Sequence, residues 1–529
     1  MRSRRLGSLA MIFALVASAC AAPAATQAPT GTPVAPPTEA ATPEPVPTEA
    51  PEPTEAAPTE AAPTEAAPTE AAPTEAPTEA PAESPAAAVP TAPTGYTELD
   101  AALNGDYGGR TVSIQTQWIG GEGANFAAAL ADFQAATGIT VQVDSIGSSH
   151  ETVLRTRIQG GQPPDLAMIA QPTSVLAYAR EGSVVDVTTF MDPEKLRTEQ
   201  EVATPLVTTG EQIWGVPYKV DVKSTVWYPI RSFEAAGYSV PTTWDELIAL
   251  SDQIVADGNG NPWCMGMEAG TATGWQATDW IEEVMLRTQP FETYEQWINH
   301  ELPFDSPEVR AAFEMVGQIF FTEGYVFGGN TAIVSTPQTE PFDPAFPPDD
   351  NWEGFTPGCW MHKIPTWYGP DFFPDVRAGS PPPGQYELGE DIGIFYLPPI
   401  NEEQGTPVLG SADTLMVLVP AGGGEPREEV KAFAQFMSTP QAIQRWIEAG
   451  SAISANLTTP TEWYEGAYKL DIAAEIVANA TAIGFDASDL MPPEVGAGAF
   501  WTQSVEWINA NGQNLDQVLQ AIDAAWPSQ

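Results

Sequence analysis

Beyond about residue 109, apolar and polar residues alternate along the chain in two different periods. Alternation at every second position, with β-branched residues, predicts strands over TVSIQTQW, ITVQVDSI and PPDLAMIA. Apolar residues three and four positions apart predict helices between them, over GGEGANFAAALADFQAATG and ETVLRTRIQGG. This order is typical of βαβ units, so we predict an α/β fold with a mostly parallel sheet. Such sheets bind ligands beyond the carboxyl ends of their strands, which here are residues 118–123 and 170–173.

The first 95 residues show neither period. MRSRR, a short apolar run and the small residues before Cys20 predict an export signal over residues 1–20. The segment ASAC resembles the bacterial lipoprotein box, which implies that Cys20 is acylated and anchors the chain to a membrane. The lipoprotein pattern prefers Leu where this chain has Ala17, so ordinary secretion stays open. Residues 21–95 repeat PTEAA without a basic residue, which predicts a disordered tether.

Composition excludes several classes of protein. The formal net charge is -50, so the chain should repel nucleic acid and anionic lipid. The three histidines and three cysteines are dispersed, and neither CxxC nor HExxH occurs. We therefore expect no metal site, no cofactor and no nucleic-acid partner.

The order of six segments carries a family resemblance. They are TVSIQTQW, LADFQAATGITVQV, GGQPPDLAMIAQPTSVLAYAREGSVVDV, IWGVPYKVDVKSTVWYP, FEAAGYSVPTTWDELIALSDQI and VKAFAQFMSTPQAIQRWIEAG. In this order they resemble the extracellular sugar-binding proteins of bacterial ABC importers, most closely the α-glucoside-binding branch and more distantly maltose-binding proteins. The resemblance covers roughly residues 109–526.

The resemblance implies a two-lobed, type II periplasmic-binding-protein-like fold, with a mixed sheet and flanking helices in each lobe and hinge crossings between them. Within a solute-binding domain over 96–529, one lobe should span about 109–217 and 410–455, and the other about 218–409 and 456–529. The lobes would close on a sugar and deliver it to the membrane permease subunits. The protein itself would be a monomer and not an enzyme.

The stretch CMGMEAGTATGWQATDW places a tryptophan and an acid one helical turn apart. If a helix starts near Trp275, Asp279 shares its face, whereas Trp280 points to the opposite, core side. A pyranose has an apolar face and a rim of hydroxyls, so its site needs flat aromatics and polar acceptors. Trp275 and Asp279 are therefore candidates, and the small residues 269–274 would let the backbone approach a ligand.

The resemblance adds further ligand candidates. Lys219 and Asp221 lie at the hinge edge, where a solvated strand-end pair is an equal alternative. The other candidates match family positions in strand ends and loops: Glu122, Gln171, Glu268, Trp367, Asp413 and Trp501, with Asp486 as a weaker one.

Two interpretations compete around Glu268. Asp257, Asn259, Asn261 and Glu268 have the spacing of calcium-loop ligands, but Pro262 stands where that loop needs glycine. We favour a helix-ending turn that leads into a strand. A calcium-stabilised adhesion protein and a surface-tethered glycoside hydrolase with two facing carboxylates remain the alternatives to a transport binding protein.

Cys264 and Cys359 form the one remaining pair of cysteines. In an exported protein such a pair is more often a disulfide than two free thiols. We predict a bridge that ties the insert over 342–382 to its lobe.

Overall fold

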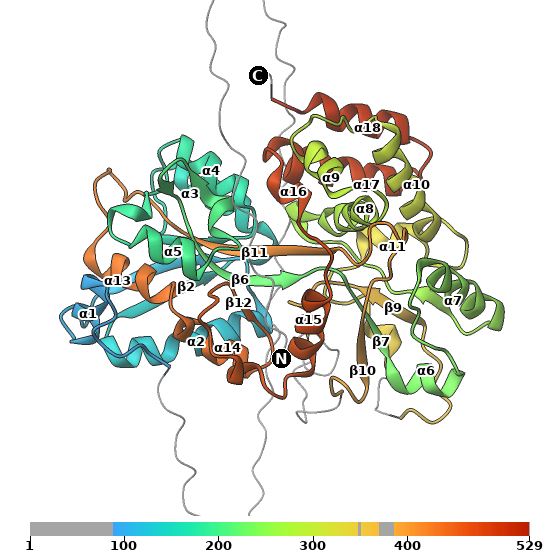
Figure 1. The fold of residues 1–529 in the computed structure, drawn as a ribbon, viewed down its shortest axis with the longest axis horizontal. Helices are drawn as coiled ribbons and strands as arrows, with labels where there is room; N and C mark the ends of the chain where they lie inside the picture. Colours follow the sequence, from blue (N-terminus) through green and yellow to red (C-terminus); the bar gives the residue numbers. More distant parts are fainter. Residues whose placement is uncertain (1–87, 348–350, 370–385, 528–529) are drawn as a thin grey trace, which may run out of the picture. The chain divides into compact units, whose positions relative to one another are not determined.

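The computed structural model describes residues 88–347, 351–369 and 386–527 (Figure 1). The predicted export signal, Cys20 and the tether through residue 87 lie outside the described residues. The end of the predicted tether lies against the first lobe: Ala88 is buried, and its N–H donates to Asp132 Oδ2 at 2.8 Å. None of the helices in the described ranges has the length and apolar character needed to span a bilayer.

The first lobe is built on a seven-stranded sheet in the described part of the chain, ordered β12-β6-β11-β3-β1-β2, with β13 paired to β11. Its strands are β1 (Thr111–Thr116), β2 (Thr140–Ser145), β3 (Leu166–Ile169), β6 (Val216–Val222), β11 (Val408–Val417), β12 (Ile453–Ser454) and β13 (Ile483–Phe485). The three strands predicted from periodicity are confirmed, and β1 pairs in parallel with β2 and β3. The expectation of a mostly parallel sheet is wrong, because β11 runs antiparallel to both β3 and β6.

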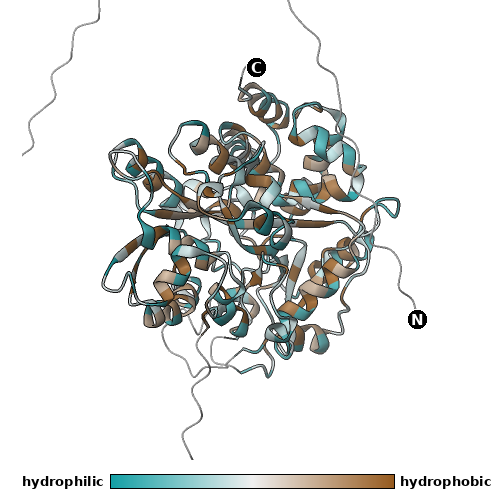
Figure 2. Ribbon diagram, turned by 60° about the vertical axis from the view of Figure 1, so that its left-hand side comes forward, coloured by the Kyte–Doolittle hydropathy of each residue, from teal (hydrophilic) through white to brown (hydrophobic). Residues whose placement is uncertain are grey.

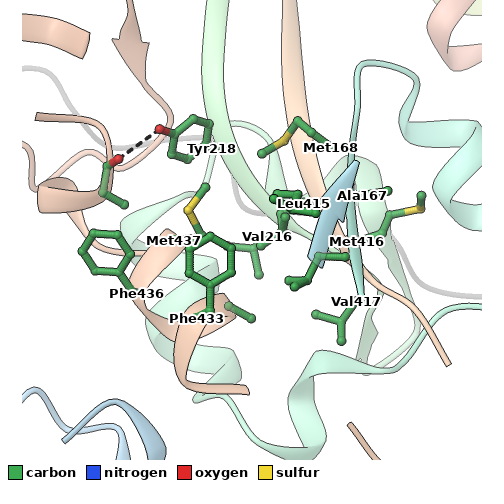
Figure 3. Packing of buried hydrophobic residues seen from close by; sticks show 14 of the residues in the cluster. Ala167, Met168, Val216, Tyr218, Leu415, Met416, Val417, Phe433, Phe436 and Met437 are labelled. Carbon is green, nitrogen blue, oxygen red and sulfur yellow. Dashed lines mark hydrogen bonds between the residues drawn. The ribbon is translucent and has the colours of Figure 1, made fainter. Parts of the chain in front are cut away.

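Helices of the first lobe cover this sheet. They are α1 (Thr97–Leu103), α2 (Gly120–Thr137), α3 (His150–Gln159), α4 (Pro172–Arg180), α5 (Pro193–Glu199), α13 (Glu428–Met437) and α14 (Gln444–Glu448), beside a small hairpin of β4 (Thr208–Thr209) and β5 (Gln212–Ile213). Figure 3 shows Phe433, Phe436 and Met437 of α13 facing Val216 and Leu415 of the sheet. The Tyr218 hydroxyl donates to the carbonyl of Ala442 at 3.0 Å, which satisfies a polar group inside this core.

The second lobe is built on a four-stranded sheet in the described residues, ordered β10-β7-β9-β8. Its strands are β7 (Thr225–Pro229), β8 (Asn261–Trp263), β9 (Cys359–Lys363) and β10 (Ile392–Tyr396). Its helices are α6 (Ile230–Ala236), α7 (Trp244–Asp257), α8 (Trp275–Thr288), α9 (Phe291–Ile298), α10 (Pro307–Phe320), α11 (Asn330–Ser335), α15 (Tyr468–Ala478), α16 (Ala487–Leu490), α17 (Trp501–Asn509) and α18 (Leu515–Ala524).

Helical periodicity explains how these helices pack. On α10 the buried residues Val309, Phe313, Val316 and Phe320 recur three and four positions apart and join the core of the second lobe. Figure 2 shows the same pattern more widely, with polar and apolar residues on different faces of the helices. Helices such as α10 therefore bury one apolar face, and that face packs against a neighbouring helix as well as against a sheet: α10 packs on α8.

Strand β6 leads from one lobe to the other. It belongs to the first sheet up to Val222, and β7 of the second sheet begins at Thr225. Strand β13, from the range predicted for the second lobe, also joins the first sheet. The lobe boundaries stated from the sequence stay a prediction; the chain passes from the first sheet to the second at residues 223–224 and returns to the first between β10 and β11.

The turn after α7 is the predicted helix-ending turn. Gly258 caps the helix in the left-handed conformation, and β8 begins at Asn261. Asp257 Oδ2 accepts a hydrogen bond from the Tyr238 hydroxyl, and the Asn261 side chain donates to the Gly324 carbonyl. The side chains of Asp257 and Asn261, two of the residues with calcium-loop spacing, therefore form hydrogen bonds within the protein.

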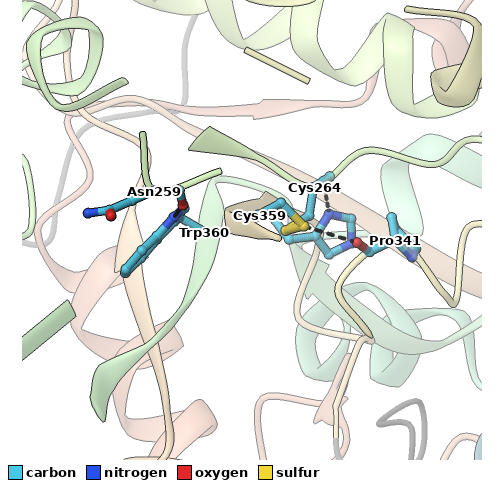
Figure 4. The surroundings of a disulfide bond; sticks show 6 residues. Asn259, Cys264, Pro341, Cys359 and Trp360 are labelled. Atoms are coloured by element: carbon cyan, nitrogen blue, oxygen red, sulfur yellow. Dashed lines mark hydrogen bonds between the residues drawn. A yellow bond between two sulfur atoms is a disulfide. The ribbon is translucent and has the colours of Figure 1, made fainter. Parts of the chain in front are cut away.

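Cys264 and Cys359 form a disulfide in this structure (Figure 4). Their Cα atoms lie 5.2 Å apart, and both residues are fully buried; Cys264 directly follows β8, and Cys359 is the first residue of β9. Nearby, Trp360 Nε1 donates to the Asn259 carbonyl at 2.6 Å. The bridge joins the two segments that flank the helices α8 to α11, while residues 348–350 and 370–382 of the predicted insert lie outside the described residues.

We expect the disulfide to stabilise the second lobe. It closes a loop of 95 residues, so the double variant Cys264→Ser/Cys359→Ser should lose about 2–5 kcal/mol of unfolding free energy. Urea unfolding of the variant and of the wild type checks this, and wild type reduced with dithiothreitol should match the variant. Alkylation of both cysteines without reductant, followed by mass measurement, would contradict the pairing.

Candidate functional site

A cavity of about 330 Å³ lies between the two lobes. The first lobe contributes residues that directly follow its parallel strands: Gln117 and Trp118 after β1, and Gln171 after β3. The second lobe contributes residues from α8, α16, α17 and the loops before them. The prediction that a ligand site lies at the carboxyl ends of β1 and β3 thus coincides with this cavity.

Most of the residues proposed from the sequence line this cavity. Those that do are Glu122, Gln171, Lys219, Asp221, Glu268, Trp275, Trp367, Asp413 and Trp501, together with the weaker candidate Asp486. Asp279 does not line it; it is buried behind Lys223, whose Nζ lies 2.8 Å from Asp279 Oδ1. Whether each lining residue contacts a ligand stays a prediction.

Several lining residues were missed from the sequence. Lys223 and Asp489 are the most consequential, and Gln117, Ser148 and Gln338 also line the cavity. A signal for Lys223 existed, because Lys219, Asp221 and Lys223 alternate in KVDVK and so share one face of an extended strand. Gln338 comes from a loop far along the chain, and local sequence offered no signal for it.

Three carboxyl groups surround the buried ammonium of Lys219. Its Nζ lies 3.0 Å from Asp221 Oδ2, 3.4 Å from Asp413 Oδ2 and 3.5 Å from Glu122 Oε1. Burial alone would lower the pKa of Lys219, but the three carboxyl groups outweigh it and raise that pKa. Burial, together with Asp413 and Asp221, raises the pKa of Glu122 to about 7 against the opposing effect of Lys219.

A second ammonium, that of Lys223, is held by the second lobe. Its Nζ donates to Asp279 Oδ1 at 2.8 Å and to Asp486 Oδ2. Asp279, Glu282 and Asp486 have carboxylate oxygens within 4.8 Å of one another, which is the spacing of metal ligands. The Lys223 ammonium binds two of these three groups and supplies the positive charge that a metal ion would otherwise bring.

Aromatic rings form one wall of the cavity. Trp275 and Trp367 are half-buried, and their ring centroids lie 6.2 Å apart. Trp275 Nε1 donates to Gln338 Oε1 at 2.7 Å, which fixes the ring. Trp501 is buried and donates to Ser488 Oγ. Trp280, predicted as core, packs against Trp263 inside the second lobe.

The small residues before Trp275 bring the backbone close to protein groups. A Cβ at Gly274 would lie 2.4 Å from the Trp501 carbonyl oxygen, and Gly274 has φ +113°. A Cβ at Gly270 would lie 2.9 Å from Ser148 Oγ in the first lobe. From the sequence, we expected these small residues to let the backbone approach a ligand. In the structure they let the backbone approach Trp501 and the first lobe.

The cavity offers acceptors that have no partner. Gln117 Oε1 and Gln171 Oε1 are buried without a hydrogen-bond donor in the part of the chain that the structure describes. Both residues line the cavity, as do five Asp or Glu residues of the two lysine clusters and their surroundings: Glu122, Asp221, Asp413, Asp486 and Asp489. A solute with many hydroxyl donors and an apolar face would match these groups.

Comparison with known proteins identifies the family. Residues 118–444 match the model for "Bacterial extracellular solute-binding protein". The chain belongs to this family. The resemblance stated from the sequence is therefore confirmed, and the family consists of binding proteins.

Two relatives of this solute-binding protein are each 34% identical to it over the aligned residues. The "Alpha-glucosides-binding periplasmic protein AglE" of Rhizobium meliloti (strain 1021) aligns over 432 residues, which are 80% of this chain and 88% of the relative. The "Osmoprotective compounds-binding protein GgtB" of Synechocystis sp. (strain ATCC 27184 / PCC 6803 / Kazusa) aligns over 437 residues, 80% of this chain and 94% of the relative.

The solved structures confirm the type II periplasmic-binding-protein-like fold. The bacterial solute receptor AcbH, whose structure was described with a preference for β-D-galactopyranose, superposes with a TM-score of 0.63. The match covers 79% of this chain and 98% of the receptor at 16% identity.

We expect Gly274→Ala to destabilise the solute-binding protein by about 2–4 kcal/mol, because the new methyl group meets the Trp501 backbone. Gly161→Ala is the matched control: Gly161 has φ +67° and no neighbour within 4 Å, so its cost should be about 1 kcal/mol. Urea unfolding measures both, and equal losses would show that the approach of Gly274 to Trp501 is unimportant.

Proposed function

We propose that the protein is the extracytoplasmic binding component of an ABC sugar importer and that its solute is an α-glucoside or a related sugar. The observation that carries this proposal is the cavity itself, where two half-buried indole rings face a surplus of buried oxygen acceptors. A pyranose satisfies both, through its apolar face and its hydroxyl groups. The identity to the α-glucosides-binding relative supports the same class.

The size of the cavity favours a short solute. Ligand sites range from about 300 to 1,000 Å³, and the 330 Å³ observed here is close to the lower limit. We infer a solute of one or two pyranose rings. Osmoprotective compounds belong in the same test, because the osmoprotective-compounds-binding relative has the same identity to this chain.

Contacts across the rim of the cavity support closure of the lobes on the solute. Thr271 Oγ1 of the second lobe donates to the Ser148 carbonyl of the first at 3.1 Å. Thr173 Oγ1 of the first lobe lies 2.8 Å from the carbonyl oxygens of Asp489 and Met491 of the second. We propose that this arrangement is the closed form and that the solute stabilises it, since only that form contacts the solute from both lobes.

Delivery to the membrane completes the proposed function. In the proposed scheme the closed form docks on the permease subunits, and an acylated Cys20 holds the protein at the membrane through the tether. The protein acts as a monomer and carries out no chemistry on its solute. Metabolic labelling with a fatty acid tests the anchor, because Cys20→Ser should abolish the label.

We expect a panel of glucose, maltose, trehalose, sucrose, palatinose and maltodextrins to contain a ligand. At a hundredfold excess over its dissociation constant, that ligand should add about 2.7 kcal/mol of stability, which thermal melting detects. Trp367→Ala should weaken the dissociation constant about tenfold or more by removing a stacking surface. Trp463 is a half-buried tryptophan outside the cavity, so Trp463→Ala should leave the dissociation constant unchanged.

The panel also separates the alternatives. Absence of a shift with every sugar would exclude this class of solute and leave the fold and family unaffected. Release of p-nitrophenol from a p-nitrophenyl α-glucoside would instead favour a glycoside hydrolase.

We expect the double variant Thr173→Val/Thr271→Ala to bind its sugar about 5- to 150-fold more weakly, because it loses two rim hydrogen bonds worth about 0.5–1.5 kcal/mol each. Thr156→Val is the control, since the Thr156 hydroxyl bonds only within α3 and is exposed. Small-angle scattering should show a smaller radius of gyration when wild type is saturated with sugar. Equal profiles with and without the bound sugar would contradict closure.

A further inference from the structure

The cluster around Lys219 contains more acid than one ammonium neutralises. Glu122, Asp221 and Asp413 all lie within 3.5 Å of Lys219 Nζ, and their side chains are 15%, 6% and 8% exposed. If all three were ionised, a mostly buried wall of the cavity would carry two unbalanced negative charges. Such charges are costly away from water, so one of the three carboxyl groups should hold a proton.

Glu122 differs from the other two acids in its partners. Asp221 Oδ1 also accepts a hydrogen bond from Thr366 Oγ1 at 3.2 Å, and Asp413 Oδ1 accepts one from Gln117 Nε2 at 2.8 Å. Neutral donors of this kind favour the ionised form of a carboxyl group. Within the described residues, Glu122 has only the Lys219 ammonium as a polar partner, at the longest of the three distances.

The other charges near Glu122 do not remove this imbalance. Glu122 lies in the first turn of α2, and the helix N-terminus favours its carboxylate. Lys219 and Asp221 face it from β6 and Asp413 from β11, while Glu151 of α3 and Lys223 after β6 line the same cavity. Lys223 is already bonded to Asp279 and Asp486. The carboxyl groups therefore still outnumber the free positive charge on this wall.

We propose that Glu122 works as a neutral carboxylic acid that donates a hydrogen bond to an oxygen of the bound sugar. This inference rests on the proposed function, because it assigns a role within the same cavity. The lining is rich in acceptors, and an ether oxygen of a sugar, in the ring or the glycosidic bond, can only accept. A protonated Glu122 supplies the donor that such an oxygen requires.

This assignment makes sugar affinity depend on pH. The pKa of Glu122 is raised to about 7, so the donating form predominates below pH 7 and is lost above it. The dissociation constant should be lowest near pH 5.5 and should rise above pH 7 by up to tenfold per pH unit. Binding above pH 7 should therefore take up a proton, which calorimetry in buffers of different ionisation enthalpy detects.

Substitutions at Glu122 separate a donor from an acceptor. Glu122→Gln keeps an N–H donor that does not titrate, so it should bind at pH 8.5 about as tightly as at pH 5.5. Glu122→Ala removes the donor and should bind weakly at both pH values. The control Glu194→Gln, at a surface acid on α5, should keep the pH dependence of the wild type.

Several results would overturn the proposal. One is a wild-type affinity that is constant from pH 5.5 to 8.5, and another is a Glu122→Gln variant that binds as poorly as Glu122→Ala. Failure of the wild type to bind any sugar at any pH would instead reject the proposed function. A titration of the ligand-free protein then still decides the protonation of Glu122: the carboxyl signal lost in Glu122→Gln should titrate near pH 7, and titration near pH 4.5 would refute a neutral Glu122.

Discussion

Two buried ammonium groups, that of Lys219 on strand β6 and that of Lys223 directly after it, are neutralised by carboxyl groups where the two lobes meet. Lys219 and Lys223 lie on the same face of one extended segment at the point where the chain leaves the first sheet for the second. A buried ammonium is tolerated only when carboxyl groups surround it. The first lobe supplies Glu122 and Asp413 to Lys219, and the second lobe supplies Asp279 and Asp486 to Lys223. Each lobe therefore brings acids to the crossing; Glu122, Asp413 and Asp486 line the cavity, while Asp279 is buried behind Lys223.

Several residues between Cys264 and Trp280 line the same cavity or support the residues that do. It begins at the disulfide, passes Glu268 on the cavity rim and touches the opposite lobe at Gly270. The backbone at Gly274 then lies against Trp501, and α8 presents Trp275 to the cavity. Further along α8, Asp279 pairs with Lys223 and Trp280 enters the core. Glycines are needed here because two backbones approach more closely than a Cβ permits.

Local pattern predicted much of this arrangement. The periods of two and 3.6 residues located β1, β2 and β3 and the start of α8, and the phase of α8 separated Trp280 from Trp275. The order of weak motifs indicated the family, and most of the residues proposed from the sequence line the cavity, although further lining residues were missed. Local sequence patterns do not show which distant segments of the chain pair with one another. The antiparallel insertion of β11 between β3 and β6 and the burial of Asp279 behind Lys223 both depend on long-range contacts, and so both were missed.

We propose that the sugar binds in the cavity lined by Lys219, Lys223 and the acids around them, and by the indole rings of Trp275 and Trp367. A crystal structure of the protein with the tightest-binding sugar of the panel tests it most directly. We expect a sugar ring against Trp275 or Trp367, with sugar oxygens within hydrogen-bond distance of Glu122 and Asp413 and with both lobes in contact with the sugar. A sugar bound outside this cavity, or bound to one lobe alone, would show that the cavity is not the sugar site.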